Sequence, residues 1–117
     1  MLTRSGFRQG GLLALGVMAS SVLASVACVS ALPEPTLGQL AAARATEPDL
    51  SLEDLQRGRA TYMKRCGSCH ALRSPSERPA ESWPLEVQRM QTQHQVRLTP
   101  EEQRDILRYL GAASRAP

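Results

Sequence analysis

The chain contains very few aromatic residues. Its 117 residues include one Phe, one Trp and two Tyr, so that aromatics make up 3 % of the sequence. The single Phe, Phe7, lies in an N-terminal leader-like segment, and no strand-like run of Val, Ile, Tyr and Thr follows residue 50. A small domain with so few large side chains needs a disulfide, a metal or a large cofactor in addition to its apolar core.

Blocks of one charge sign are also absent. The formal net charge is +3, and acidic and basic residues are interspersed along the chain. There is no internal repeat, no Gly-rich phosphate loop and no basic stripe. This pattern indicates a solvated surface and argues against a nucleic-acid partner.

Residues 1–31 have the layout of a secretory signal peptide. Arg4 and Arg8 precede an uncharged stretch rich in Leu, Ala and Val, which ends in small residues. This layout predicts export, to the periplasm or beyond. An uncleaved signal anchor is the alternative, and it would also place the rest of the chain outside the cytoplasm.

The end of this leader contains the first of three cysteines. Cys28 in LASVAC resembles the lipidated cysteine of bacterial lipoproteins, although Ser25 stands where Leu is usual. Cleavage after Ala27 or Ala31 fits about as well. A membrane contact is therefore expected only through acyl chains on Cys28 or through an uncleaved anchor.

The remaining chain is expected to form a linker over 32–50 and one all-α domain over 51–117, built from about three helices. Three prolines and the lack of a persistent apolar period suggest the linker. Ser51 and Thr99 each precede acidic residues, which is typical of helix starts. Gly58 lies on the apolar face of the first helix, so a close approach by another helix is expected there.

The middle segment SWPLEVQRMQTQH predicts a helix with one narrow stripe. Trp83, Val87, Met90 and His94 follow at offsets of four, three and four residues. Such a stripe would suit the covering of a flat apolar object, and it aligns a thioether and an imidazole one turn apart.

The second and third cysteines form the motif C-x-x-C-H at Cys66, Cys69 and His70. A zinc site needs four ligands, and adjacent Cys69 and His70 rarely reach one ion together. A redox dithiol needs a βαβ context, which is missing. Haem attachment fits the order of residues: two thiols bond the porphyrin vinyl groups, and the imidazole then reaches the iron.

With this motif, residues 51–117 resemble a small monohaem cytochrome c of the class I kind. The segments LQRGRATYMKRCGSCHAL and EEQRDILRYL carry the resemblance. It implies a fold of helices packed around one covalent haem c, with thioethers at Cys66 and Cys69 and His70 as the proximal iron ligand. A carbonyl near Pro75 is expected to accept a hydrogen bond from His70.

The middle of the chain departs from the family because only nineteen residues separate His70 from Met90. Met90 is the expected distal ligand and His94 the alternative; each also has an ordinary interpretation, as a core gap-filler and an exposed polar residue. Haem propionates are expected to attract three arginines: Arg73, Arg78 and Arg89. The haem is expected to pack against three apolar side chains: Leu72, Trp83 and Val87.

The predicted function is one-electron transfer with redox-protein partners, without bond chemistry by side chains. A subunit role in a larger oxidoreductase stays open. The alternative is a haem-based ligand-binding or sensing domain whose sixth ligand is displaceable.

Overall fold

The computed structural model describes residues 32–115, and every regular element in that range is helical. The elements are α1 (Leu37–Ala43), α2 (Leu52–Cys66), the short 3-10 turns η1 (Pro75–Glu77) and η2 (Ala80–Ser82), α3 (Trp83–Gln93) and α4 (Pro100–Ala113). The all-α prediction is confirmed: α2, α3 and α4 lie in the predicted domain 51–117, and α1 lies in the stretch expected as a linker. The predicted signal peptide and Cys28 lie outside the described residues. Within the described range, no helix has the length and hydropathy needed to cross a bilayer.

The two long helices begin at the residues that the sequence predicted, each with reciprocal hydrogen bonds. At α2 the Asp54 N–H donates to Ser51 Oγ (3.1 Å), and the Ser51 N–H donates to the Asp54 carboxylate (2.8 Å). At α4 the same pair of bonds joins Thr99 and Glu102. These capping boxes satisfy N–H groups that a helix start leaves free. The Ser51 hydroxyl, with the Ser51 N–H, holds the pKa of Asp54 well below its usual range.

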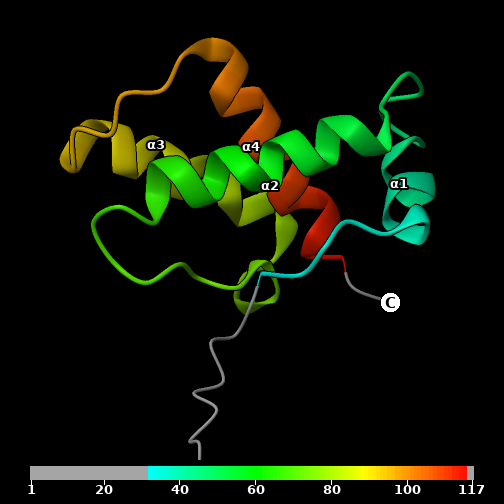
Figure 1. The fold of residues 1–117 in the computed structure, drawn as a ribbon, viewed down its shortest axis with the longest axis horizontal. Helices are drawn as coiled ribbons and strands as arrows, with labels where there is room; N and C mark the ends of the chain where they lie inside the picture. Colours follow the sequence, from blue (N-terminus) through cyan, green and yellow to red (C-terminus); the bar gives the residue numbers. More distant parts are fainter. Residues whose placement is uncertain (1–31, 116–117) are drawn as a thin grey trace, which may run out of the picture.

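Helices α2 and α4 cross at Gly58, as predicted, with α4 passing behind α2 in Figure 1. A Cβ at Gly58 would lie 2.1 Å from the backbone oxygen of Asp105, so the backbones touch at the crossing. The Asp105 carboxylate is almost fully buried there, and Arg57 Nε donates to it at 2.7 Å. Arg108 donates to it from the next turn (3.3 Å). The buried charge is therefore paired from two sides.

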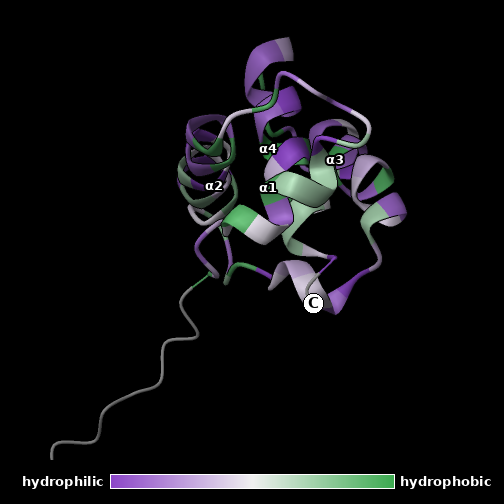
Figure 2. Cartoon of the chain, turned by 90° about the vertical axis from the view of Figure 1, so that its right-hand side faces the viewer, coloured by the Kyte–Doolittle hydropathy of each residue, from purple (hydrophilic) through white to green (hydrophobic). Residues whose placement is uncertain are grey.

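Residues 32–50, expected as a linker, pack against this helix pair. Leu32 is buried in the main core, its carbonyl accepts from Arg59 at 3.0 Å, and Tyr109 donates to the Pro33 carbonyl at 2.9 Å. A second core cluster consists of Leu40, Ala43, Leu50, Leu55 and Ala112. The segment lacked an apolar period because its contacts come from single leucines and backbone carbonyls. In Figure 2, α1 faces the viewer with α4 behind it.

Candidate functional site

A cavity of about 680 Å³ opens where α2 ends and faces α3. The five residues that the sequence singled out all line it: Cys66, Cys69, His70, Met90 and His94. Its apolar wall includes Leu72, Trp83, Val87, Val96 and Leu98. Thiols, imidazoles and a thioether from two separate elements thus meet around one largely apolar space.

The end of α2 presents the two thiols in a tight turn. Cys66 is the last residue of the helix and half-buried, whereas Cys69 is exposed, and both are free thiols. A Cβ at Gly67 would lie 2.6 Å from the Met63 carbonyl oxygen, so any larger residue at this spacer position would require the end of α2 to shift. Burial, and then the neighbouring Cys69, raises the pKa of the Cys66 thiol.

The exposed imidazole of His70 is oriented by its own neighbour. His70 Nδ1 lies 2.8 Å from the Ala71 carbonyl oxygen, and a proton on Nδ1 donated there leaves Nε2 free to bind a metal. The expected acceptor near Pro75 is wrong. The Pro75 carbonyl instead accepts from Trp83 Nε1 at 3.3 Å, the longer of the two hydrogen bonds that this buried N–H makes.

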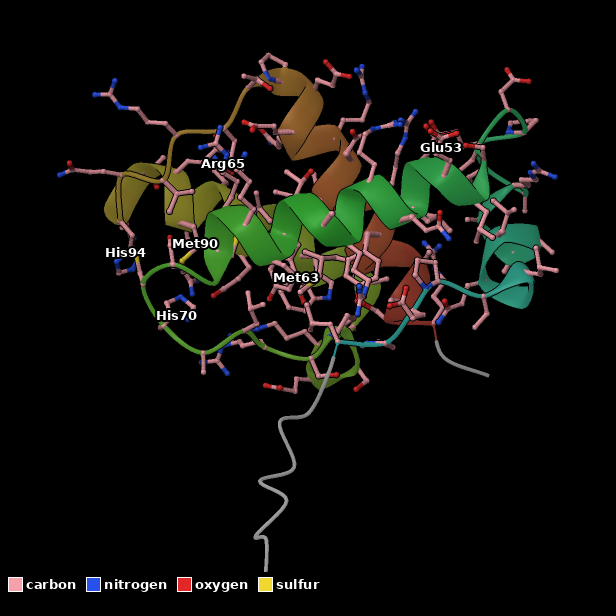
Figure 3. The ribbon with its side chains drawn as sticks, viewed as in Figure 1. Glu53, Met63, Arg65, His70, Met90 and His94 are labelled. Carbon is pink, nitrogen blue, oxygen red and sulfur yellow. The ribbon has the colours of Figure 1, made fainter. Side chains whose placement is uncertain are left out.

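Met90 and His94 lie one turn apart at the C-terminal end of α3. Met90 is half-buried, and His94 is the exposed C-cap residue. Figure 3 shows both side chains at the same end of the molecule as His70. The helix ends because Gln95 takes a left-handed conformation (φ 57°) and the Val96 N–H returns to the Met90 carbonyl (3.1 Å). The chain then leads into the cavity wall.

An aromatic brace connects the loop after the motif with α3 and α4. The Tyr62 hydroxyl donates to the Arg73 carbonyl (3.1 Å), and its ring meets that of Trp83 edge-on, with centroids 6.3 Å apart. Trp83 Nε1 also donates to Ser114 Oγ at 2.7 Å. Burial raises the pKa of Tyr62 to about 12, so this hydroxyl keeps its proton near neutral pH.

The three arginines expected near propionates each face a protein carboxylate. Arg73 lies 3.5 Å from Glu77, and Arg78 and Arg89 lie 3.7 Å and 3.1 Å from Glu86. Of the three, only Arg73 lines the cavity. The Arg78 Nε is buried without a hydrogen-bond partner among residues 32–115.

Sequence reasoning missed several wall residues. Arg65 and Glu86 line the cavity, and so do Val96 and Leu98 from the segment between α3 and α4. The two apolar residues alternate with polar ones, and this period of two is the signal of an extended segment with one buried face. Arg65 is held by Glu102 at 2.6 Å, a partner that no local pattern indicates.

The cavity suits a flat apolar cofactor that carries its own metal. Its size falls within the usual range for ligand and cofactor sites. Within 32–115, no three His, Cys, Asp or Glu side chains are grouped closely enough to hold a metal ion. A haem iron brings four ring ligands of its own, so it would need only one or two side chains, such as the imidazoles and the thioether that line this cavity.

Comparison with known families agrees with this geometry. A family model described as the haem-binding part of the quinohemoprotein amine dehydrogenase A alpha subunit matches residues 56–115, which is more than half of the chain. The chain belongs to this haem-binding family. The matched range of this family member begins in α2 and ends after α4, so it includes the whole cavity wall. No curated protein and no solved structure matches the chain significantly.

The two hydrogen bonds of the Trp83 indole lead to a prediction for this haem-binding domain. Replacing Trp83 by Phe should keep most of the ring packing but leave the Pro75 carbonyl and Ser114 hydroxyl without their shared donor. We expect the free energy of unfolding to fall by about 2 kcal/mol. Denaturant unfolding of both proteins measures this. Ser114→Ala, the control that removes one acceptor only, should cost less; an equal or larger loss would contradict the assigned role of the indole N–H.

Proposed function

We propose that this chain carries one haem c, attached through Cys66 and Cys69, and transfers single electrons between redox proteins. The observation that carries the proposal is the single cavity lined by both thiols, by His70 and by Met90. The haem-binding family supports the cofactor. When bound, the haem supplies an iron that accepts and releases one electron.

The chain's residues would then have distinct tasks. The two sulfurs form thioethers, and His70 binds the iron through Nε2 while its Nδ1 is held at Ala71. Trp83 and Val87, both buried, exclude water from the cavity wall on the α3 side. The resulting likeness to class I cytochromes c is part of the proposal.

Met90 is the proposed distal ligand. Its thioether is half-buried within α3, whereas the imidazole of His94 is exposed at the helix end. A half-buried ligand within the helix is held more firmly than one at its terminus. Methionine–histidine ligation also raises the reduction potential relative to two histidines.

Separate substitutions test this assignment. Met90→Ala should abolish the spectroscopic signature of sulfur ligation and lower the reduction potential by tens of millivolts or more, because the thioether stabilises the ferrous state. His94→Ala, one turn away, is the matched control and should leave spectrum and potential almost unchanged. Absorption spectra and potentiometric titration of the purified proteins provide the measurement. An unaltered spectrum in Met90→Ala would transfer the role to His94.

The second candidate function is haem-based ligand binding or sensing. It is favoured by the exposure of His70 and His94 beside the cavity, which leaves this end accessible to small molecules. Uptake of carbon monoxide by the reduced protein discriminates between the two functions. If the protein transfers electrons and Met90 is firmly bound to the iron, the reduced protein should take up no carbon monoxide at low concentrations of the gas. If the distal ligand is displaceable, uptake of carbon monoxide should be complete.

The site of action is proposed to be the periplasm or its membrane surface. Residues 1–31 support export, and Cys28 provides a candidate lipid attachment site. The description of the matched family names a dehydrogenase alpha subunit, so a role as an electron-transfer subunit or domain of a larger oxidoreductase is consistent with it. Mass spectrometry of the mature protein reports the N-terminus, its lipid and the haem together.

A further inference from the structure

A second cavity, also of about 680 Å³, lies along α4 on the side of residues 43–50. It shares no lining residue with the cavity of the thiols. We call it the α4 groove; it is lined by three cations (Arg104, Arg108 and Arg115), one carboxylate (Glu47, which pairs with Arg108), the polar residues Thr46 and Gln103, and the apolar or small residues Ala43, Leu50, Pro100, Leu107, Gly111 and Ala112. Ala43, Leu50 and Ala112 are buried, whereas Arg104 and Arg115 are exposed. The groove therefore has an apolar bottom between exposed basic side chains.

Gly111 has no close-packed neighbour within the described part of the chain. A glycine inside a helix costs stability relative to alanine, and at Gly58 the contact with Asp105 accounts for it. At Gly111, in contrast, a Cβ would meet no atom within 4 Å. No described glycine has a positive φ, and Ser114 caps α4, so Gly111 does not terminate the helix. The bare backbone at Gly111 faces open space in the groove.

Only one of the three arginines in the groove forms ion pairs with the described part of the chain. Arg108 is bound by Glu47 and Asp105. Arg104 and Arg115 form no ion pair with any carboxylate of residues 32–115. Two exposed guanidinium groups along an apolar groove complement carboxylates that flank an apolar helix face.

We propose that the α4 groove docks an acidic amphipathic helix of a partner protein, which crosses α4 at Gly111 as α4 crosses α2 at Gly58. The glycine permits close approach of the backbones, and Arg104 and Arg115 pair with carboxylates beside the apolar stripe. Because the groove and the thiol-lined cavity have separate walls, this contact would hold a partner while leaving the haem site free for electron exchange. This interface goes beyond electron transfer itself.

The test uses the mature holoprotein and a synthetic amphipathic peptide with an alanine–leucine face flanked by glutamates. We expect binding in a fluorescence anisotropy titration, with NMR shifts confined to residues 43–50 and 100–115. Gly111→Leu fills the bare position and should weaken binding at least about tenfold. The double variant Arg104→Glu, Arg115→Glu should weaken it at least as much and reverse its salt dependence, because added salt then screens a repulsion between carboxylates.

Two controls keep the result interpretable. Gly38→Leu adds the same side chain to α1, where a Cβ has only one neighbour, the Thr36 hydroxyl oxygen at 3.9 Å, and should bind normally. A peptide with lysines in place of the glutamates should not bind. Equal binding by Gly111→Leu and the wild type, equal binding of both peptides, or shifts confined to the thiol-lined cavity would each overturn the proposal. Self-association of the chain through this groove without peptide binding would overturn it as well.

Discussion

Replacing Cys66 and Cys69 together by alanine is expected to yield exported protein without covalent haem. Both thiols border the cavity that faces α3, and the proposed attachment depends on their sulfurs. Without these bonds the apolar wall would hold haem only through weak, reversible binding, so the domain should also lose much of its stability, since a domain this small depends on its cofactor to complete the core. Acid-acetone extraction of the pigment, followed by mass spectrometry, measures the attachment.

The single variants and the third cysteine are the controls. Cys66→Ala and Cys69→Ala should each retain haem through one remaining bond, with lower yield. Cys28→Ser changes the cysteine of the proposed signal peptide and should retain haem fully while losing any acyl chain. A double variant whose pigment resists extraction would contradict the attachment through these two sulfurs.

Gly58→Ala is expected to be more destabilising than the same substitution at any other described glycine. The added carbon would lie 2.1 Å from the Asp105 backbone oxygen and 2.9 Å from the Tyr109 Cβ. Neither neighbour is the end of a flexible side chain, so the two helices must separate. Overpacking of this kind costs about 3 kcal/mol, and the unfolding midpoint should fall by roughly 15 °C. Thermal unfolding of the holoprotein, followed by circular dichroism, provides the measurement.

Gly111→Ala is the matched control for this prediction. The same substitution in α4 meets no atom within 4 Å and should stabilise the helix by about 1 kcal/mol. The two glycine variants should therefore shift the unfolding midpoint in opposite directions. Similar unfolding midpoints for the two variants would show that α2 and α4 pack less closely at Gly58 than they do in the structure.

Several features follow from local sequence alone. Helices α2 and α4 start at Ser51 and Thr99 because capping depends on residues within one turn, and the structure has both boxes. The close crossing at Gly58 was also predictable, because a glycine on an apolar helix face lets a second backbone approach where any side chain would block it. The motif at Cys66–His70 indicated haem for a similar reason: attachment chemistry needs a fixed local order of groups.

Other features required the tertiary structure. The sequence predicted a linker over residues 32–50. Their packing was not visible in the sequence because contacts such as that of Arg59 with the Leu32 carbonyl join segments far apart in the chain. The acceptor for His70 was placed near Pro75, whereas the conformation of the loop after the motif brings the Ala71 carbonyl oxygen to 2.8 Å from Nδ1. Val96 and Leu98 became wall residues only through the turn at Gln95.

The sequence by itself thus determined the helical class, the helix starts and the order of thiols and imidazole in the motif, because each depends on neighbours within one or two turns. Tertiary structure alone decided that residues 32–50 pack into the core, and that a groove lies along α4. The physical reason is that cavities and hydrogen-bond partners arise between segments distant in sequence, where packing selects among groups that a local pattern cannot rank.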